Sequence, residues 1–169
     1  MRYLKIGLIF YALSSSLGCA QNDAAPPTAV ASSNVDGKQF LLGAEPEGAI
    51  PVLDLKSKAT HGEKVVVVGD VLSGKQTWVD GRAAFRLTDC SVASEVSLCT
   101  DDHCEECALQ TLNASAFVKI VDEFGKPLNV DSRALLGLKG EERVVVRGLA
   151  SRTEDGSVSI VADGVYVRR

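Results

Sequence analysis

The chain has 169 residues, of which 46% are hydrophobic, 24% charged and 5% aromatic, and its formal net charge is −4. This length suits one domain of ordinary size with an extension, and it excludes a multidomain assembly. The composition is that of a globular protein, which excludes a disordered or collagen-like chain. We therefore interpret the sequence as that of a single folded domain with an extension.

The N-terminus has the pattern of an export signal. Arg2 and Lys5 precede an apolar stretch at residues 6–13, and small residues then lead to Cys19. The stretch is too short to span a bilayer but suits a secretory signal. This arrangement resembles the lipobox of bacterial lipoproteins, in which the signal (here residues 1–18) is removed and the cysteine carries lipid. Plain secretion, an uncleaved anchor and a cytoplasmic protein are the alternatives, because the residues before the cysteine depart from the usual lipobox order.

Export would change both the charge and the cysteine count. Removal of residues 1–18 takes away two bases and no acid, so 16 basic and 22 acidic side chains remain and the net charge becomes −6. Lipidation of Cys19 leaves four of the five cysteines in an oxidising compartment. We therefore expect an extracytoplasmic protein that is lipid-anchored to a bacterial membrane, on the periplasmic side or in the cell envelope.

The next segments predict a linker and an ordered lead-in. Residues 19–37 are rich in Ala, Pro, Ser and Asn, and this composition is typical of a flexible linker. Residues 38–60 predict an ordered lead-in with a short helix over 49–59. We expect Ile50 and Leu53 to face the domain from this helix.

Residues 61–169 predict a mainly β domain with five strands. The predicted strands are 64–72, 83–88, 114–121, 143–149 and 157–167. Residues 131–138 predict a short helix between the third and fourth strands, capped by Asp131 or Ser132. This order is typical of the OB-fold, a five-stranded Greek-key barrel. A β-sandwich edge or a flatter sheet is the alternative.

Two details within the predicted strands bear on barrel closure. Gly69 and Gly148 fall inside strands, where glycine weakens packing unless the strand must bend. A small closed barrel needs such bends, so these glycines favour closure. In the second strand, the alternation predicts Phe85 and Leu87 inward and Arg86 outward.

Several segments resemble a set of uncharacterised lipoproteins from planctomycete-type bacteria. These segments are residues 45–48, 62–69, 78–85, 135–138, 144–146 and 165–168. Together they extend over about residues 40–169. The resemblance implies an OB-fold domain and a lipid-anchored address, and it implies no activity.

The segment between the second and third strands carries the chain's unusual chemistry. Over residues 89–107 it has six acidic residues and no Lys or Arg, a formal charge of −6. The same segment contains Cys90, Cys99, His103, Cys104 and Cys107. We expect a Cys-rich acidic loop over 89–113, which is too long to stay unstructured in a compact domain unless something orders it.

Two disulfides are the first explanation for this order, because nearby cysteines in an exported protein usually pair. Each bridge would stabilise the domain by about 2–4 kcal/mol by restricting the unfolded chain. A bridge from Cys104 to Cys107 would close a short, strained ring. We therefore favour pairings that reach back to Cys90 and Cys99.

A metal site is the second explanation. Four thiolates with the His103 imidazole suit zinc, copper(I) or an iron–sulfur centre, and without a cation so many negative charges would repel one another. The segment has one Cys-x2-Cys knuckle, whereas a four-cysteine zinc ribbon has two. A redox-active Cys-x2-Cys pair is a third explanation, which Glu105 and Glu106 disfavour because they would raise the thiol pKa.

The rest of the sequence indicates a binding protein rather than an enzyme. It has no Gly-x-Ser-x-Gly motif and only two histidines. Nucleic-acid binding is disfavoured by the acidic charge and the few aromatic residues. Trp78 is a candidate ligand-binding residue at a barrel mouth, although core packing is the favoured role. We expect a non-catalytic, cofactor-free module that binds a protein or small ligand, with a zinc- or copper-binding protein as the alternative.

Overall fold

The computed structural model describes residues 35–74, 76–99 and 104–169. The predicted signal, Cys19, most of the linker and His103 lie outside the described residues. The end of the predicted linker is ordered: Val35 packs against the core, and Asp36 caps the 3₁₀ helix η1 (Gly37–Phe40). No described helix is long and apolar enough to cross a membrane.

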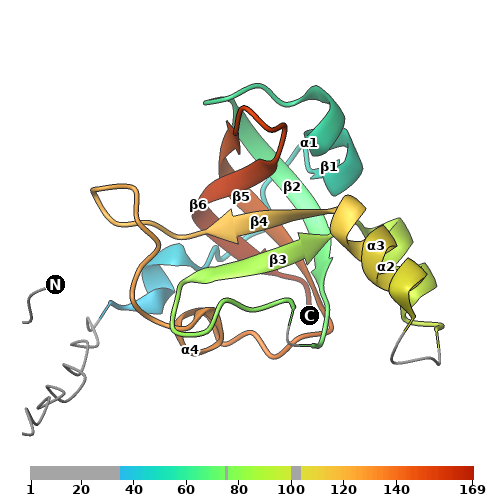
Figure 1. Cartoon of the computed structure of the whole chain (residues 1–169). Coiled ribbons are helices and arrows are strands. Elements are labelled where there is room, and N and C mark those ends of the chain that lie inside the picture. Colours follow the sequence, from blue (N-terminus) through green and yellow to red (C-terminus); the bar gives the residue numbers. More distant parts are fainter. Residues whose placement is uncertain (1–34, 75, 100–103) are drawn as a thin grey trace, which may run out of the picture. The chain divides into compact units, whose positions relative to one another are not determined.

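Five of the described strands close into a barrel (Figure 1). Their bounds are β2 (Lys64–Val71), β3 (Ala84–Thr88), β4 (Ser115–Lys119), β5 (Glu142–Arg152) and β6 (Val158–Val167). They follow the order β2-β3-β4-β6-β5, and β5 pairs with β2 to complete the ring. β4 and β6 are parallel, and the other neighbours in the ring are antiparallel. This is the strand arrangement of the OB-fold, so the predicted fold class is confirmed.

The helix α4 (Ser132–Leu136) lies between β4 and β5, as the sequence predicted. The Asp131 side chain accepts a hydrogen bond from the Arg133 amide, and Gly137 ends the helix in a left-handed conformation. Leu135 and Leu136 are buried in the core cluster. The helix therefore contributes apolar side chains to the barrel's core.

The core consists of aliphatic side chains and one phenylalanine. It includes Val67, Val71, Phe85, Leu87, Val118, Val144, Val146 and Ile160. A Cβ at Gly148 would overlap the Val161 carbonyl oxygen, and one at Gly69 would lie 2.6 Å from the Leu87 side chain. The two glycines therefore permit the close strand approach that closure requires.

The lead-in forms β1 (Ile50–Pro51) and α1 (Val52–Lys58). β1 pairs in parallel with β2, and Ile50 packs against the core. In α1, Val52 and Leu55 are fully buried, whereas Leu53 is 45% exposed. The prediction that Leu53 faces the domain is wrong, because the helix begins at Val52 and its buried face is set by that start.

The Cys-rich segment contains helices rather than a continuous loop. α2 (Cys90–Val96) follows β3, and α3 (Glu105–Asn113) leads into β4, so both lie at one side of the barrel (Figure 1). We call α2, α3 and the described residues between them (97–99 and 104) the helical insertion. α3 buries no residue, and α2 buries only Ala93. These helices therefore lack the buried apolar face by which a helix usually packs onto a domain.

Candidate metal centre

Three cysteines of the helical insertion converge on one point. The Sγ atoms of Cys99, Cys104 and Cys107 all lie within 4.8 Å of one another, and each residue is half-buried. The Sγ atoms of Cys104 and Cys107 are 2.7 Å apart. Three cysteine sulfurs that converge on one point are a ligand set that a soft metal ion such as zinc or copper(I) accepts.

Local structure explains why these three sulfurs meet. Cys99 follows the last turn of α2, where its amide donates to the Val96 carbonyl at 3.0 Å. Cys104 is the N-cap of α3, and its sulfur accepts a hydrogen bond from the Cys107 amide at 3.2 Å. The Cys-x2-Cys spacing places both sulfurs on one side of the first turn. The end of one helix thereby meets the start of the next.

The sulfurs influence one another's protonation. Hydrogen bonds with Cys104 and then with Cys99 raise the pKa of Cys107 to about 12, because they stabilise the protonated thiol. A thiol with such a pKa is a poor nucleophile at neutral pH. The raised pKa therefore disfavours Cys107 as a redox nucleophile. A bound metal ion would replace these protons and supply the compensating charge.

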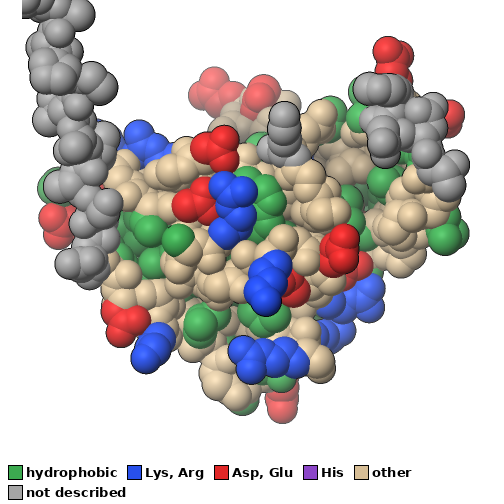
Figure 2. Space-filling model, turned by 90° about the horizontal axis from the view of Figure 1, so that it is seen from below, with side chains coloured by type: hydrophobic (Ala, Val, Ile, Leu, Met, Phe, Trp, Pro, Cys, Tyr) green, Lys and Arg blue, Asp and Glu red, His purple; other side chains and the backbone are tan. Residues whose placement is uncertain are grey.

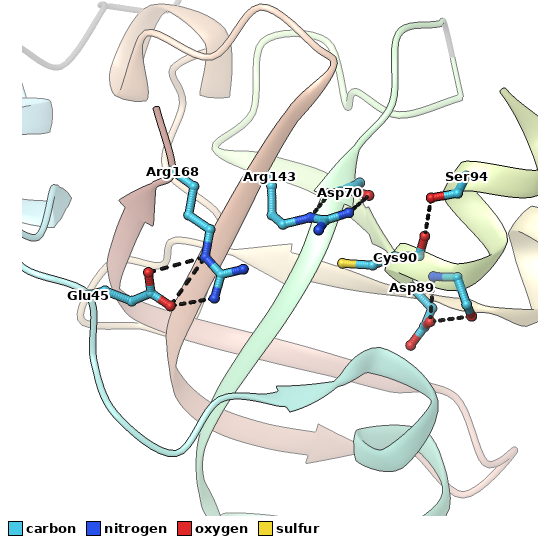
Figure 3. Close-up of polar contacts among 8 residues, drawn as sticks. Glu45, Asp70, Asp89, Cys90, Ser94, Arg143 and Arg168 are labelled. Atoms are coloured by element: carbon cyan, nitrogen blue, oxygen red, sulfur yellow. Dashed lines mark hydrogen bonds and ion pairs between the residues drawn. The ribbon is translucent and has the colours of Figure 1, made fainter.

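Cys90 lies apart from the sulfur cluster. It begins α2 beside the ion pair of Asp70 and Arg143, whose nearest atoms are 2.8 Å apart (Figure 3). Burial and then the charge of Asp70 raise the pKa of Cys90. No two of the four described domain cysteines are at disulfide-bonding distance. The structure thus separates one cysteine from the three that the sequence grouped with it.

A cleft of about 330 Å³ lies beside the cluster. It is lined by Cys99, Cys104 and Cys107 from the insertion, by Leu72 and Thr77 from the connection between β2 and β3, and by Arg86 of β3. A metal ion held by the three sulfurs would therefore border a space large enough for a small molecule.

Among the described residues that line this cleft, Arg86 is the one with a positive charge. Its guanidinium lies 4.5 Å from the Phe117 ring centroid, and it donates to the Ser115 hydroxyl at 3.0 Å and to the Gln76 carbonyl at 3.3 Å. Burial lowers its pKa. The alternation of β3 predicted that Arg86 faces outward, but nothing in the sequence indicated that it meets the cysteines.

Trp78 packs against the core, as its favoured role predicted. Its ring centroid is 6.3 Å from that of Phe85, and the Arg133 guanidinium lies 5.5 Å from the indole centroid. Arg133 in turn forms ion pairs with Asp80 and Asp131. The indole of Trp78 therefore contacts both Phe85 and Arg133. Ligand binding by Trp78 stays a prediction.

The face of the barrel seen in Figure 2 carries mixed charge. Lys and Arg side chains lie beside Asp and Glu side chains, and no continuous basic stripe crosses the described part of this view. Binding of single-stranded nucleic acid needs a basic groove with stacking aromatic residues.

No protein-family model matches the chain, and no curated protein matches it. Three similar solved structures are OBody proteins bound to hen egg-white lysozyme. OBody AM1L10 and OBody AM3L15 are each 16% identical with a TM-score of 0.43, and OBody AM3L09 is 18% identical with a TM-score of 0.41. The alignments cover 76%, 75% and 72% of this chain and 98%, 98% and 95% of those chains. The strand order and pairing, rather than these alignments, establish the OB-fold.

Proposed function

We propose that this chain is an exported, lipid-anchored OB-fold binding protein in which Cys99, Cys104 and Cys107 hold a soft metal ion. The observation that carries the proposal is the convergence of the three Sγ atoms within 4.8 Å. Zinc accepts three thiolates together with a fourth ligand, and copper(I) prefers thiolates. The ion would order the helical insertion beside the barrel and would border the cleft.

Packing supports a metal in this position. The helical insertion buries little apolar surface, and Leu98 and Leu109 are 82% and 59% exposed. Two helices this short are not stable in water on their own propensity. A metal ion that bridges the end of α2 and the start of α3 would supply the missing stabilisation, as structural metals do in small domains.

A disulfide between Cys104 and Cys107 is the second candidate. The 2.7 Å separation of the two sulfurs favours it over any pairing with Cys90, which is outside the cluster. The protein would then be a metal-free module that binds a protein or small ligand, with the start of α3 stapled. The two candidates differ in thiol and metal content, which makes them separable.

Thiol titration under denaturing conditions, combined with metal analysis, tests the proposal on the full chain purified from its native compartment. We expect one metal ion per chain and four titratable thiols besides Cys19. Cys104→Ser should abolish metal retention, whereas Cys90→Ser, a matched control outside the cluster, should retain it. A count of two titratable thiols or none, together with no bound metal, would contradict metal binding and support a disulfide.

Residues 1–34 lie outside the described part of the chain, so support for export and anchoring comes from the sequence. The basic start, the apolar stretch and Cys19 carry this part of the proposal. In cells given labelled palmitate, we expect the wild type to incorporate label and to enter the detergent phase. Cys19→Ala should do neither. An intact, unacylated leader among soluble cell contents would contradict the anchor.

A further inference from the structure

We infer that the cleft beside the cysteines admits a small organic anion with a thiolate and a carboxylate, which binds between the metal ion and Arg86. The thiolate would fill the metal's fourth position, and the carboxylate would accept hydrogen bonds from the guanidinium. This inference rests on the proposed function, because the thiolate needs a metal ion to bind.

The cluster and the cleft provide the first recognition element. The three thiolates that the described residues supply leave one position of a tetrahedral ion for a further ligand. Cys99, Cys104 and Cys107 all line the same cleft, so a fourth ligand can approach from there. The cleft measures about 330 Å³. A water molecule occupies about 30 Å³ of liquid, so the cleft has room for several non-hydrogen atoms.

Arg86 provides the second recognition element. Its guanidinium is held in place by the neutral groups of Phe117, Ser115 and Gln76. Among the described residues, the arginines in ion pairs with carboxylates are Arg133, Arg143, Arg147 and Arg168. Arg86 is half-buried without such a partner in the described part of the chain. A planar guanidinium in this state favours a carboxylate ligand, which it can bind in a bidentate manner.

The acidic side chains near the cluster disfavour a ligand with many negative charges. Glu105 and Glu106 lie in the first turn of α3, beside the cluster. Their carboxylates would repel a polyanion within the screening distance of about 8–10 Å. In a ligand with one thiolate and one carboxylate, the thiolate would bind the metal ion and the carboxylate would bind Arg86. No negative charge would then be left without a positive partner.

The test uses the full chain substituted with cobalt(II), whose sulfur-to-cobalt absorbance reports thiolate ligands. The probes are mercaptoacetate and 2-mercaptoethanol, which share a thiol and differ in the carboxylate. We expect both to increase the sulfur-to-cobalt absorbance while cobalt stays bound through gel filtration. Mercaptoacetate should bind about tenfold more tightly, the effect of a charge-assisted hydrogen bond in a partly exposed site.

Variants assign the preference to Arg86. Arg86→Gln should abolish the tenfold preference and leave the affinity for 2-mercaptoethanol unchanged. Arg86→Lys keeps the positive charge but cannot form a bidentate hydrogen bond to a carboxylate, so it should retain part of the preference. This variant preserves the test if Arg86→Gln does not fold. Arg147→Gln is the control, because Arg147 pairs with Asp163 outside the cleft, and it should bind both thiols as the wild type does.

Failure of the inference and failure of the proposed function give different results. Absence of sulfur-to-cobalt absorbance before any thiol is added would contradict the proposed metal site itself. Normal absorbance that neither thiol changes would show a closed coordination sphere, as a protein ligand such as His103 would produce, and would overturn only the inference. Equal affinities for the two thiols, or loss of cobalt to them, would also overturn it.

Discussion

The barrel and the helical insertion achieve order in opposite ways. In the barrel, side chains such as Phe85 and Val118 are fully buried, and every strand contributes to one apolar core. In the helices of the insertion only Ala93 is buried, while Leu98 and Leu109 face solvent. The barrel is therefore stabilised by apolar burial, whereas the insertion depends on caps, cysteines and the metal that we propose they hold.

Asp89 connects the two regions. It follows β3 and is 4% exposed, and its carboxylate accepts hydrogen bonds from the Ser91 amide and hydroxyl at 3.1 and 2.7 Å. It also accepts one from the Leu53 amide in α1 at 3.1 Å. One buried carboxylate thus links α1 to the start of α2.

The largest expected effect is on the barrel core. Phe85→Ala should lower the free energy of unfolding by about 3–5 kcal/mol, because it removes a fully buried ring and leaves a cavity. Denaturation in urea measures this change. Phe124→Ala is the control, since Phe124 is 78% exposed, and it should change stability by less than about 0.5 kcal/mol. A loss below about 1 kcal/mol for Phe85→Ala would contradict the barrel as the source of stability.

Removal of the proposed metal ion should affect the insertion alone. Treatment with a chelator should destabilise α3 by about 2 kcal/mol, the lower range for a cross-link, and accelerate its amide exchange about 30-fold. Amides of β2 and β5 should keep their protection. The Cys104→Ser variant is the control, because a chelator should change nothing further in it. Equal acceleration in barrel and insertion would show that the two regions unfold together.

Removal of the Asp89 carboxylate, which connects α1 to α2, should lower the free energy of unfolding by a smaller amount. Asp89→Ala should cost about 1–2 kcal/mol, the usual cost of losing an N-cap with its hydrogen bonds. Chemical denaturation at neutral pH measures it. Glu154→Ala, at an exposed position, is the control and should be neutral. No change in Asp89→Ala would mean that the capping bonds do not stabilise the fold.

The pH dependence of stability tests the same carboxylate. Burial by itself would raise the pKa of Asp89, but hydrogen bonds from Leu53 and then Ser91 outweigh it, so the pKa is lowered. A carboxyl with a lowered folded pKa stabilises fully above its unfolded pKa of about 3.9, and this contribution is lost as pH falls through the folded pKa. Asp89→Ala should therefore lose less stability than the wild type on acidification. Parallel pH curves would contradict the shift.

The smallest effect is expected at a surface ion pair of the barrel. Arg147 and Asp163 are 2.7 Å apart, with 48% and 63% of their side chains exposed. Such pairs contribute about 0–1 kcal/mol. Arg147→Gln should change the free energy of unfolding by less than about 0.5 kcal/mol, and by still less in 1 M salt. A loss above about 1 kcal/mol would show that the barrel depends on polar contacts more than its core indicates.

Local patterns in the sequence were sufficient for the barrel. β-Branched or alternating runs marked the strands, Asp131 marked the start of α4, and Gly69 and Gly148 indicated where strands bend. These signals are local because strand alternation, helix caps and glycine conformations act over a few residues. The same signals failed at Leu53, where a small change in the helix start altered the buried face.

The site was decided by tertiary structure. The sequence by itself determined only the two-residue spacing of Cys104 and Cys107, because this segment was expected to be a loop, and the structure places both cysteines at the first turn of α3. That Cys99 joins them, that Cys90 does not, and that Arg86 faces the same cleft depend on where α2 ends and how the insertion meets β3. Distances between residues on different elements follow from packing and strand closure, and no periodic pattern along the chain records them.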